Sequence, residues 1–254
     1  MSKITENRKF MQCPSFKEGM AESDQSKGVT APAFGKTITG PLTILPLFEG
    51  ITTASYTDLL DSRRSVRSYA KTPMTKAQLA FMLWSVNGIQ SLRSDVATFR
   101  PVPSGGSRHP FETYVTVRNV EGLKPGLYHY LPTENMGEKC VTLEFLGDIP
   151  NYEDTITEMV VGQAWAAKAP VVLFCSCIPY KAEWRYHELA HRVVLIDLGH
   201  VGQNAMLSAA ALGLGSCCMA AYDQQVCDKV IGLDGIDEYV VYGIAVGAAE
   251  DTTE

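Results

Sequence analysis

Three arginines and three serines lie within nine residues, in the sequence DSRRSVRSY at residues 61–69. Guanidinium groups bind phosphate or carboxylate oxygens through paired hydrogen bonds, and a serine hydroxyl adds a further donor. The whole chain has 254 residues and a formal net charge of −6, which is not typical of a nucleic-acid-binding protein. The cluster therefore predicts a site for a small anion, with a solvated charged turn as the alternative.

A second segment, PSGGSRHPFE at residues 103–112, is rich in small residues. Glycines allow a backbone to approach a flat ring or a sugar chain closely, although a plain surface turn has the same composition. Arg108 and His109 in this segment could face either substrate or solvent.

A third segment, LGLGSCCMAAYD at residues 212–223, contains a G-x-G pattern after a predicted helix. The dinucleotide-binding fingerprint follows a strand instead, so we reject a Rossmann fold and expect a loop here. Cys217 and Cys218 have no basic neighbour in the local sequence, and we expect these thiols to pack rather than react.

The segment AEWRYHELAHR at residues 182–192 could contribute proton transfer or metal binding. Arg185 and Tyr186 are candidates for the first role, and capping of the following helix is the alternative. His187 and His191 have a spacing that can ligate a metal on one helix face. No convincing set of further ligands lies beside them, so we predict no metal site.

Hydrophobic spacing predicts the helices that must position these groups. Residues 75–89 form an amphipathic helix with Thr75 as N-cap and Gly88 as its end. Helices are also predicted near residues 56–60, over 153–168, over 187–215 and over 227–233. The uncharged stretch 204–222 approaches membrane-spanning length, but its G-L-G break favours a buried helix, so we expect no membrane segment.

Predicted strands cover residues 111–120, 126–132, 139–147, 169–178 and 239–247. This pattern indicates an α+β fold with a central, mainly antiparallel sheet wrapped by helices. Residues 1–50 are expected to be an extended N-terminal arm, and residues 51–254 the functional domain. The start of the chain lacks the apolar core of a signal peptide, and the seven cysteines form no C-x-x-C pair, as expected for reduced thiols in a cytoplasmic protein.

Five blocks in order, RRSVRSY, PSGGSRHPFE, GLYHY, HRVVLIDLGHVGQNAMLSAAALGLGS and YGIAVG, resemble the FMN-dependent nitroreductase family. They are most similar to its SagB-type dehydrogenase branch, which is related to azoline oxidases. The resemblance runs from Tyr56 to Gly247. It implies a nitroreductase-like fold and an interlocked homodimer that holds two FMN molecules at the subunit interface.

The resemblance also implies roles for individual residues. The residues expected against the flavin phosphate and ribityl chain are Arg63, Arg64, Ser65 and Arg67. Those expected to reach the flavin from the partner subunit are Ser104, Gly105, Gly106 and Ser107. Those expected along the isoalloxazine ring are Gly215, Met219, Ala220 and Ala221.

Two departures from the family pattern concern Arg185 and the C-terminus. Azoline oxidases carry a Lys-Tyr pair where this chain has Arg185 and Tyr186. Because arginine stays protonated, Tyr186 is the remaining candidate base, polarised by Arg185. Many nitroreductases also add a basic phosphate ligand near the C-terminus, whereas this chain ends in VGAAEDTTE.

The predicted function is that of an FMN oxidoreductase that works by a ping-pong mechanism. NAD(P)H would reduce the flavin, and an electron-poor nitroaromatic, quinone or enone would then accept the electrons. One alternative is a SagB-type dehydrogenase that oxidises a peptide or natural-product intermediate and passes electrons to oxygen. A flavin-binding protein without turnover and a plain interaction protein are further alternatives.

Overall fold

The computed structural model describes residues 3–12 and 20–250, which contain a seven-stranded sheet and a separate two-stranded hairpin. In the large sheet the strand order is β1-β6-β5-β4-β7-β9-β8, and every neighbouring pair is antiparallel. Its strands are β1 (Leu42–Leu45), β4 (Phe111–Val117), β5 (Gly126–Tyr130), β6 (Val141–Gly147), β7 (Val171–Cys177), β8 (Gly215–Met219) and β9 (Tyr239–Gly247). The hairpin consists of β2 (Ser91–Ser94) and β3 (Ala97–Phe99).

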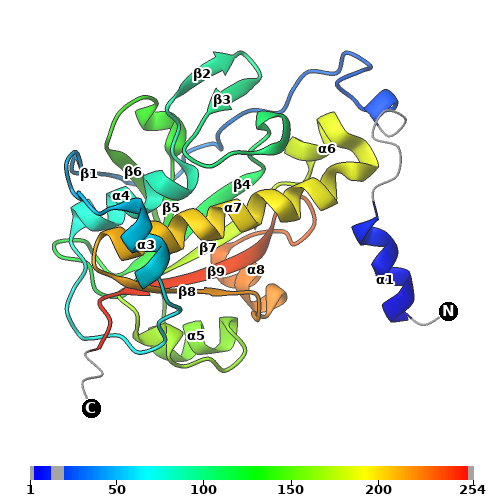
Figure 1. Ribbon diagram of the computed structural model, residues 1–254. Coiled ribbons are helices and arrows are strands. Elements are labelled where there is room, and N and C mark those ends of the chain that lie inside the picture. Colours follow the sequence, from blue (N-terminus) through cyan, green and yellow to red (C-terminus); the bar gives the residue numbers. More distant parts are fainter. Residues whose placement is uncertain (1–2, 13–19, 251–254) are drawn as a thin grey trace.

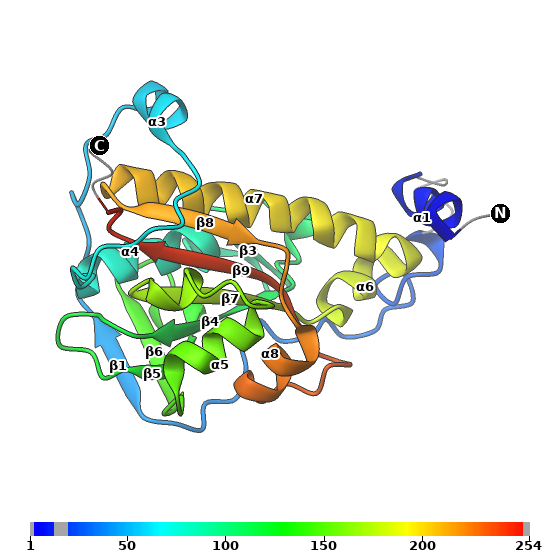
Figure 2. The ribbon, with the colours of Figure 1, turned by 90° about the horizontal axis from the view of Figure 1, so that it is seen from below.

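Helices cover both faces of the sheet, with α4 and α7 on one face and α5 and α8 on the other (Figures 1 and 2). The α-helices are α1 (Lys3–Met11), α3 (Tyr56–Ser62), α4 (Lys76–Asn87), α5 (Tyr152–Met159), α6 (Tyr180–Tyr186), α7 (Ala190–Ala211) and α8 (Gln224–Ile231). Short 3-10 turns are Gly105–Ser107, Pro132–Asn135, Ala166–Lys168 and His187–Leu189. No helix within residues 3–12 and 20–250 is both long and apolar enough to cross a membrane.

The central strands β4 and β7 are buried along their whole length. Successive side chains alternate between the faces of a strand, so Leu173 joins the core under α4 and α7, while Val172 and Phe174 join the core under α5 and α8. Burial on both faces explains why the sequence of β7 is a continuous apolar run. The structure thus confirms the predicted α+β architecture with a central antiparallel sheet.

Helix α4 follows its sequence prediction closely. The Thr75 hydroxyl accepts from the backbone N–H of Gln78 at 3.1 Å, and the Gln78 side chain accepts from the Thr75 N–H at 2.9 Å, which completes a capping box. The helix ends at Asn87 with Gly88 as its C-cap, and the predicted apolar face, Leu79, Met82, Leu83 and Val86, is buried.

Two predicted helices are shorter in the structure than in the sequence interpretation. The helix expected over 153–168 ends at Met159, because Val161 and Gly162 adopt positive φ angles of 49° and 85°. The helix expected from residue 187 begins at Ala190, because His187 has a φ of 49° and starts a separate 3-10 turn. A non-glycine residue with positive φ cannot continue a right-handed helix.

The prediction of a loop over residues 212–223 is wrong for Gly215–Met219, which form strand β8 against β9. The hairpin of β2 and β3 was not predicted. In the region expected to be an extended arm, Lys3–Met11 are helical and Leu42–Leu45 add an edge strand to the sheet. The division of the chain at residue 50 stays a prediction, and residues 13–19 lie outside the described part of the arm.

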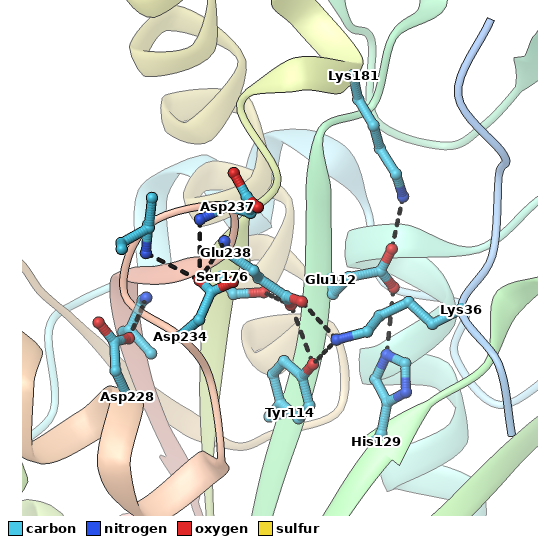
Figure 3. A network of polar contacts seen from close by, with 12 residues as sticks. Lys36, Glu112, Tyr114, His129, Ser176, Lys181, Asp228, Asp234, Asp237 and Glu238 are labelled. Atoms are coloured by element: carbon cyan, nitrogen blue, oxygen red, sulfur yellow. Dashed lines mark hydrogen bonds and ion pairs between the residues drawn. The ribbon is translucent and has the colours of Figure 1, made fainter. Parts of the chain in front are cut away.

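A buried network of charges connects the middle of the sheet with the N-terminal segment (Figure 3). Glu238 accepts hydrogen bonds from Tyr114 at 3.0 Å, from Ser176 at 2.6 Å and from Lys36. Glu144 accepts from the backbone N–H groups of Thr39 and Gly40. These contacts fix residues 36–40 against the sheet.

The second part of the network is centred on Glu112, which lies on β4. Its carboxylate contacts the Lys181 ammonium at 2.6 Å and the His129 ring at 3.2 Å. Lys181 also donates to the Phe34 carbonyl at 3.1 Å. Burial raises the pKa of Glu112, but Lys181 and His129 outweigh this effect and hold the pKa at about 2.

Replacing Glu112 with Gln leaves the buried Lys181 ammonium without its counter-charge. We expect a loss of about 3–5 kcal/mol in the free energy of unfolding, measured by urea denaturation at pH 7. Because the folded pKa lies below the ordinary value of 4.5, the wild-type stabilisation is complete above that pH and declines as the pH falls toward 2.

Asp148→Asn is the matched control, since Asp148 pairs with Lys124 at 2.7 Å with both side chains more than half exposed. Its effect on unfolding should be much smaller than that of Glu112→Gln. Equal losses for the two variants would show that the network contributes no more than a surface pair.

Candidate functional site

The arginine-rich segment runs beside β8. The Val66 N–H donates to the Ser216 carbonyl at 3.0 Å, and Ser65 forms a parallel bridge with Ser216. A Cβ on Gly215 would lie 2.6 Å from the Val66 side chain, so this close approach requires glycine. The fold thereby brings two segments together that sequence analysis singled out separately.

Arg63 and Arg64 line a cavity of about 220 Å³ between this segment, β8 and α7. The remaining lining residues include Gly213, Gly215 and Ser216, together with Met206 and Ala210 of α7. Arg63 is half-buried, whereas Arg64 is exposed and donates to the carbonyls of Asp61 and Arg63 at 2.7 and 2.9 Å. Neither guanidinium forms an ion pair with a carboxylate of residues 3–12 or 20–250.

The chemistry of this donor set fits a phosphate group. Two arginines without counter-charges border the cavity, and Ser216 is part of the same lining. Phosphate oxygens accept paired hydrogen bonds from guanidinium groups, and two arginines match the charge of a phosphate monoester.

Other members of the predicted phosphate set lie outside the cavity lining. Arg67 is exposed, and its guanidinium carbon lies 5.7 Å from the centre of the Trp165 ring. Ser65 is also exposed and is not part of the lining. The chain alone therefore brings only Arg63 and Arg64 of the four residues to the cavity.

The residues predicted along a flavin ring occupy both ends of β8. Gly215 borders the arginine-lined cavity, whereas Met219 is buried at the far end and packs against Gly243. Ala220 and Ala221 follow and are exposed, with the Ala221 carbonyl accepting from the Gln163 side chain at 2.9 Å. A strand rises about 3.3 Å per residue, so Gly215 and Met219 are roughly 13 Å apart.

The thiols of β8 have the properties of packed rather than reactive cysteines. Burial raises the pKa of the Cys218 thiol to about 11, and burial also raises the pKa of Cys217. Little thiolate forms at neutral pH under these conditions.

The glycine-rich loop is anchored to α7 by Asp197. This carboxylate accepts from the Ser104 hydroxyl at 2.6 Å and from the Gly105 N–H at 3.0 Å. The same Ser104 hydroxyl accepts from the His109 N–H at 2.9 Å, which closes the loop on itself. Burial raises the pKa of Asp197 above its ordinary value, although the bonds from Ser104 and Gly105 oppose this effect.

Gly106 lies against Arg185 and Tyr186, the residues predicted to act on substrate. With a φ of 59°, a Cβ at Gly106 would lie 2.4 Å from the Arg185 side chain and 2.8 Å from the Tyr186 hydroxyl oxygen. Arg108 reaches the same residue and donates to the Gly106 carbonyl at 3.0 Å. The structure thus gathers Ser104, Gly105, Gly106, Ser107, Arg185 and Tyr186 in one cluster, hereafter the loop cluster.

The histidines of this region form no recognisable metal centre. The His191 ring contacts Glu183 at 2.8 Å, a carboxylate partner that the sequence interpretation did not find. No group of three or more metal-ligating side chains occurs within the described residues.

The arginine-lined cavity and the loop cluster lie at different positions along α7. The cavity contacts Met206 and Ala210, whereas the loop cluster contacts Val193 and Asp197. A helix rises 1.5 Å per residue, so Asp197 and Met206 are separated by about 14 Å along its axis. Figure 2 shows α3 beside one end of α7 and α6 at the other.

Sequence reasoning missed Asp197 and left Arg108 undecided. A signal for Asp197 was present, because it is the one charged residue in the apolar run VVLIDLGH, and a buried carboxylate requires hydrogen-bond donors. Its partners, Ser104 and Gly105, are far away in the sequence and could not be identified without the fold.

Two known proteins are similar to this chain in sequence. A protein of Methanocaldococcus jannaschii, MJ1384, named as a nitroreductase, is 34% identical over 170 residues, which cover 66% of this chain and 80% of the relative. The microcin B17-processing protein McbC of Escherichia coli is 29% identical over 140 residues, which cover 53% of this chain and 49% of McbC.

The fold is also shared with a solved structure, the E. coli microcin synthetase McbBCD complex with truncated pro-MccB17 bound. The TM-score is 0.59 at 22% identity, with 92% of this chain and 90% of the other chain covered. At this identity the likeness shows the fold alone. A sequence profile of the nitroreductase family matches residues 60–248, most of the chain. The profile match and the MJ1384 relationship confirm the resemblance seen in the sequence: the chain belongs to the nitroreductase family of oxidoreductases.

Proposed function

We propose that the protein is an FMN-dependent oxidoreductase that transfers electrons from NAD(P)H to an electron-poor small molecule. The observation that carries this proposal is that Arg63 and Arg64, both without a carboxylate partner in the described residues, line one cavity together with Gly215. Such a cavity suits the phosphate of FMN. Arg67 and Ser65 lie on the same segment outside the lining, and they would contribute to binding of the phosphate and ribityl chain from there. Bound FMN supplies the redox chemistry, since its ring accepts a hydride and passes electrons onward.

We infer that the complete site forms between two copies of the chain. The loop cluster lies about 14 Å along α7 from the arginine-lined cavity and contributes no residue to its lining. Beside the loop cluster α7 exposes Leu195 and Ile196, with exposed fractions of 54% and 49%. The neighbouring helix α3 has no buried residue and projects from the body (Figure 2). Pairing two chains across this apolar surface would bring the cavity of one to the loop cluster of its partner.

In this arrangement the chain's own residues position the reactants. Gly105 and Gly106 allow the backbone to approach a flat ring, and Asp197 holds that backbone in place. The Tyr186 hydroxyl lies beside Gly106 and is our candidate for proton transfer, with the Arg185 guanidinium carbon 5.6 Å from its ring centre. The remaining border of the flavin site would be formed by Gly215, Met219, Ala220 and Ala221.

A second candidate function is that of a SagB-type dehydrogenase acting on a peptide or natural-product intermediate. The similarity to McbC, a microcin-processing protein, favours it, as does the position of the Tyr186 hydroxyl beside Gly106. The replacement of the expected lysine by Arg185 argues for the reductase, because arginine cannot serve as a base.

Absorption spectroscopy tests the proposal directly. We expect purified protein, or protein reconstituted with FMN, to show a bound flavin spectrum, and anaerobic NADH or NADPH to bleach it within the dead time of manual mixing. Bound flavin that neither nucleotide reduces would favour the dehydrogenase. Protein that stays colourless after exposure to FMN would rule out both functions.

The double variant Arg63→Gln, Arg64→Gln tests the phosphate site. Each charged hydrogen bond contributes about 1.5–3 kcal/mol, so we expect FMN affinity, measured by fluorescence titration, to fall at least tenfold. Riboflavin lacks the phosphate, and its affinity should not change. Arg93→Gln, at a side chain that stacks over Phe99 on the hairpin, is the control. Equal weakening of FMN and riboflavin would place the phosphate elsewhere.

The variant Ile196→Glu tests the assembly. A charge on the α7 surface should oppose pairing of two chains, so we expect monomers in light-scattering chromatography and a parallel loss of FMN. Ile236→Glu is the control, since Ile236 is 77% exposed on a loop after α8. A dimeric Ile196→Glu variant with unchanged FMN content would contradict this assembly.

A further inference from the structure

Two cationic side chains that contact Gly106 of the loop cluster have no counter-charge. Arg108 and Arg185 are both half-buried, and each contacts Gly106, Arg108 through a hydrogen bond to its carbonyl and Arg185 through direct packing. Neither forms an ion pair with a carboxylate of the described residues. Asp197, the α7 carboxylate that anchors the loop, already accepts hydrogen bonds from Ser104 and Gly105.

Not every N–H group of these two guanidinium groups has a hydrogen-bond acceptor. Arg185 donates through Nη1 to the Gln25 side chain at 2.7 Å, while its buried Nε has no acceptor within the described part of the chain. Arg108 donates through Nε and through Nη2, to the carbonyls of Gly106 and Val96. A buried N–H without an acceptor and two uncompensated charges are costly, and a bound anion would offset that cost.

Lys181 differs from this pair because the fold supplies a counter-charge for it: its ammonium group contacts Glu112 at 2.6 Å. Burial lowers the pKa of Arg108, and the adjacent charge of Arg185 lowers it further. The repulsion between Arg108 and Arg185 is thus a property of this pair, and it persists without a ligand.

We propose that Arg108 and Arg185 form a binding site for a carboxylate group of the substrate, next to Tyr186. This inference rests on the proposed function and names the class of molecule that the same site accepts. A planar carboxylate accepts paired, charge-assisted hydrogen bonds from a guanidinium group, so it can use donors of both arginines and offset their mutual repulsion.

The matched pair of 4-nitrobenzoate and 4-nitrobenzamide tests this site. The two compounds have similar size and both are electron-poor, but only 4-nitrobenzoate is charged. We expect the FMN-loaded protein to bind 4-nitrobenzoate at least tenfold more tightly by calorimetry without NAD(P)H, and to turn it over with a correspondingly lower KM. Arg108→Gln should remove this preference, while its binding of 4-nitrobenzamide changes less than threefold. Arg185→Gln should also lower the ratio of the two affinities.

Three further measurements keep the outcomes distinct. Arg108→Lys retains the charge and should keep part of the preference, and Arg93→Gln should keep all of it. Thermal unfolding midpoints close to that of the wild type show that the variants fold. Equal wild-type affinity for the two nitro compounds would overturn the carboxylate site, even if NAD(P)H reduces the flavin normally. Stronger binding of inorganic phosphate than of 4-nitrobenzoate would also overturn it, whereas failure of flavin reduction alone would count against the proposed function.

Discussion

The pairing of the arginine-rich segment with β8 is the contact on which the candidate site depends. The bond from Val66 to Ser216 and the absence of a side chain at Gly215 hold Arg63 and Arg64 over the cavity. This pairing also covers the outer edge of a strand that would otherwise end the sheet with open backbone groups. One set of main-chain contacts thus completes the sheet and positions the cations.

Glycine has a second role at the other end of α7. At Gly105 and Gly106 any side chain would overlap Val193 or Arg185, so the loop can only pack there without one. Asp197 then fixes the loop by accepting from both a hydroxyl and an N–H group. A rigid loop of this kind limits the loss of conformational entropy when a flat ligand binds.

Sequence reasoning was most successful where local chemistry decides the structure. The capping box of Thr75 and Gln78 and the continuous apolar run of β7 are local signals, and both elements were predicted with nearly correct bounds. The sequence interpretation failed where a single residue changes the backbone, as at Val161 and His187, whose positive φ angles no apolar pattern indicates. It also failed for β8, whose strand conformation depends on pairing with β9.

The site residues also divide into those marked by local sequence and those that depend on contacts between distant segments. Composition alone marked the arginine cluster and the glycine loop, because their residue types are unusual and local. The placement of Arg67 over Trp165, the role of Asp197 and the convergence of Arg108 with Arg185 depend on contacts between distant segments. Such contacts follow from the topology of the sheet and the helices, which sequence periodicity does not specify.

The network that fastens residues 36–40 to the sheet affects how the chain can be shortened. A truncated protein that started at residue 51 would lack Lys36 and the N–H groups of Thr39 and Gly40, and the carboxylates of Glu238 and Glu144 would remain inside without those partners. It would also lose β1 and reopen β6 as a bare sheet edge. Proteolytic removal of residues 36–45 would therefore damage the core itself, and a protease cut that released them would inactivate the protein rather than mature it.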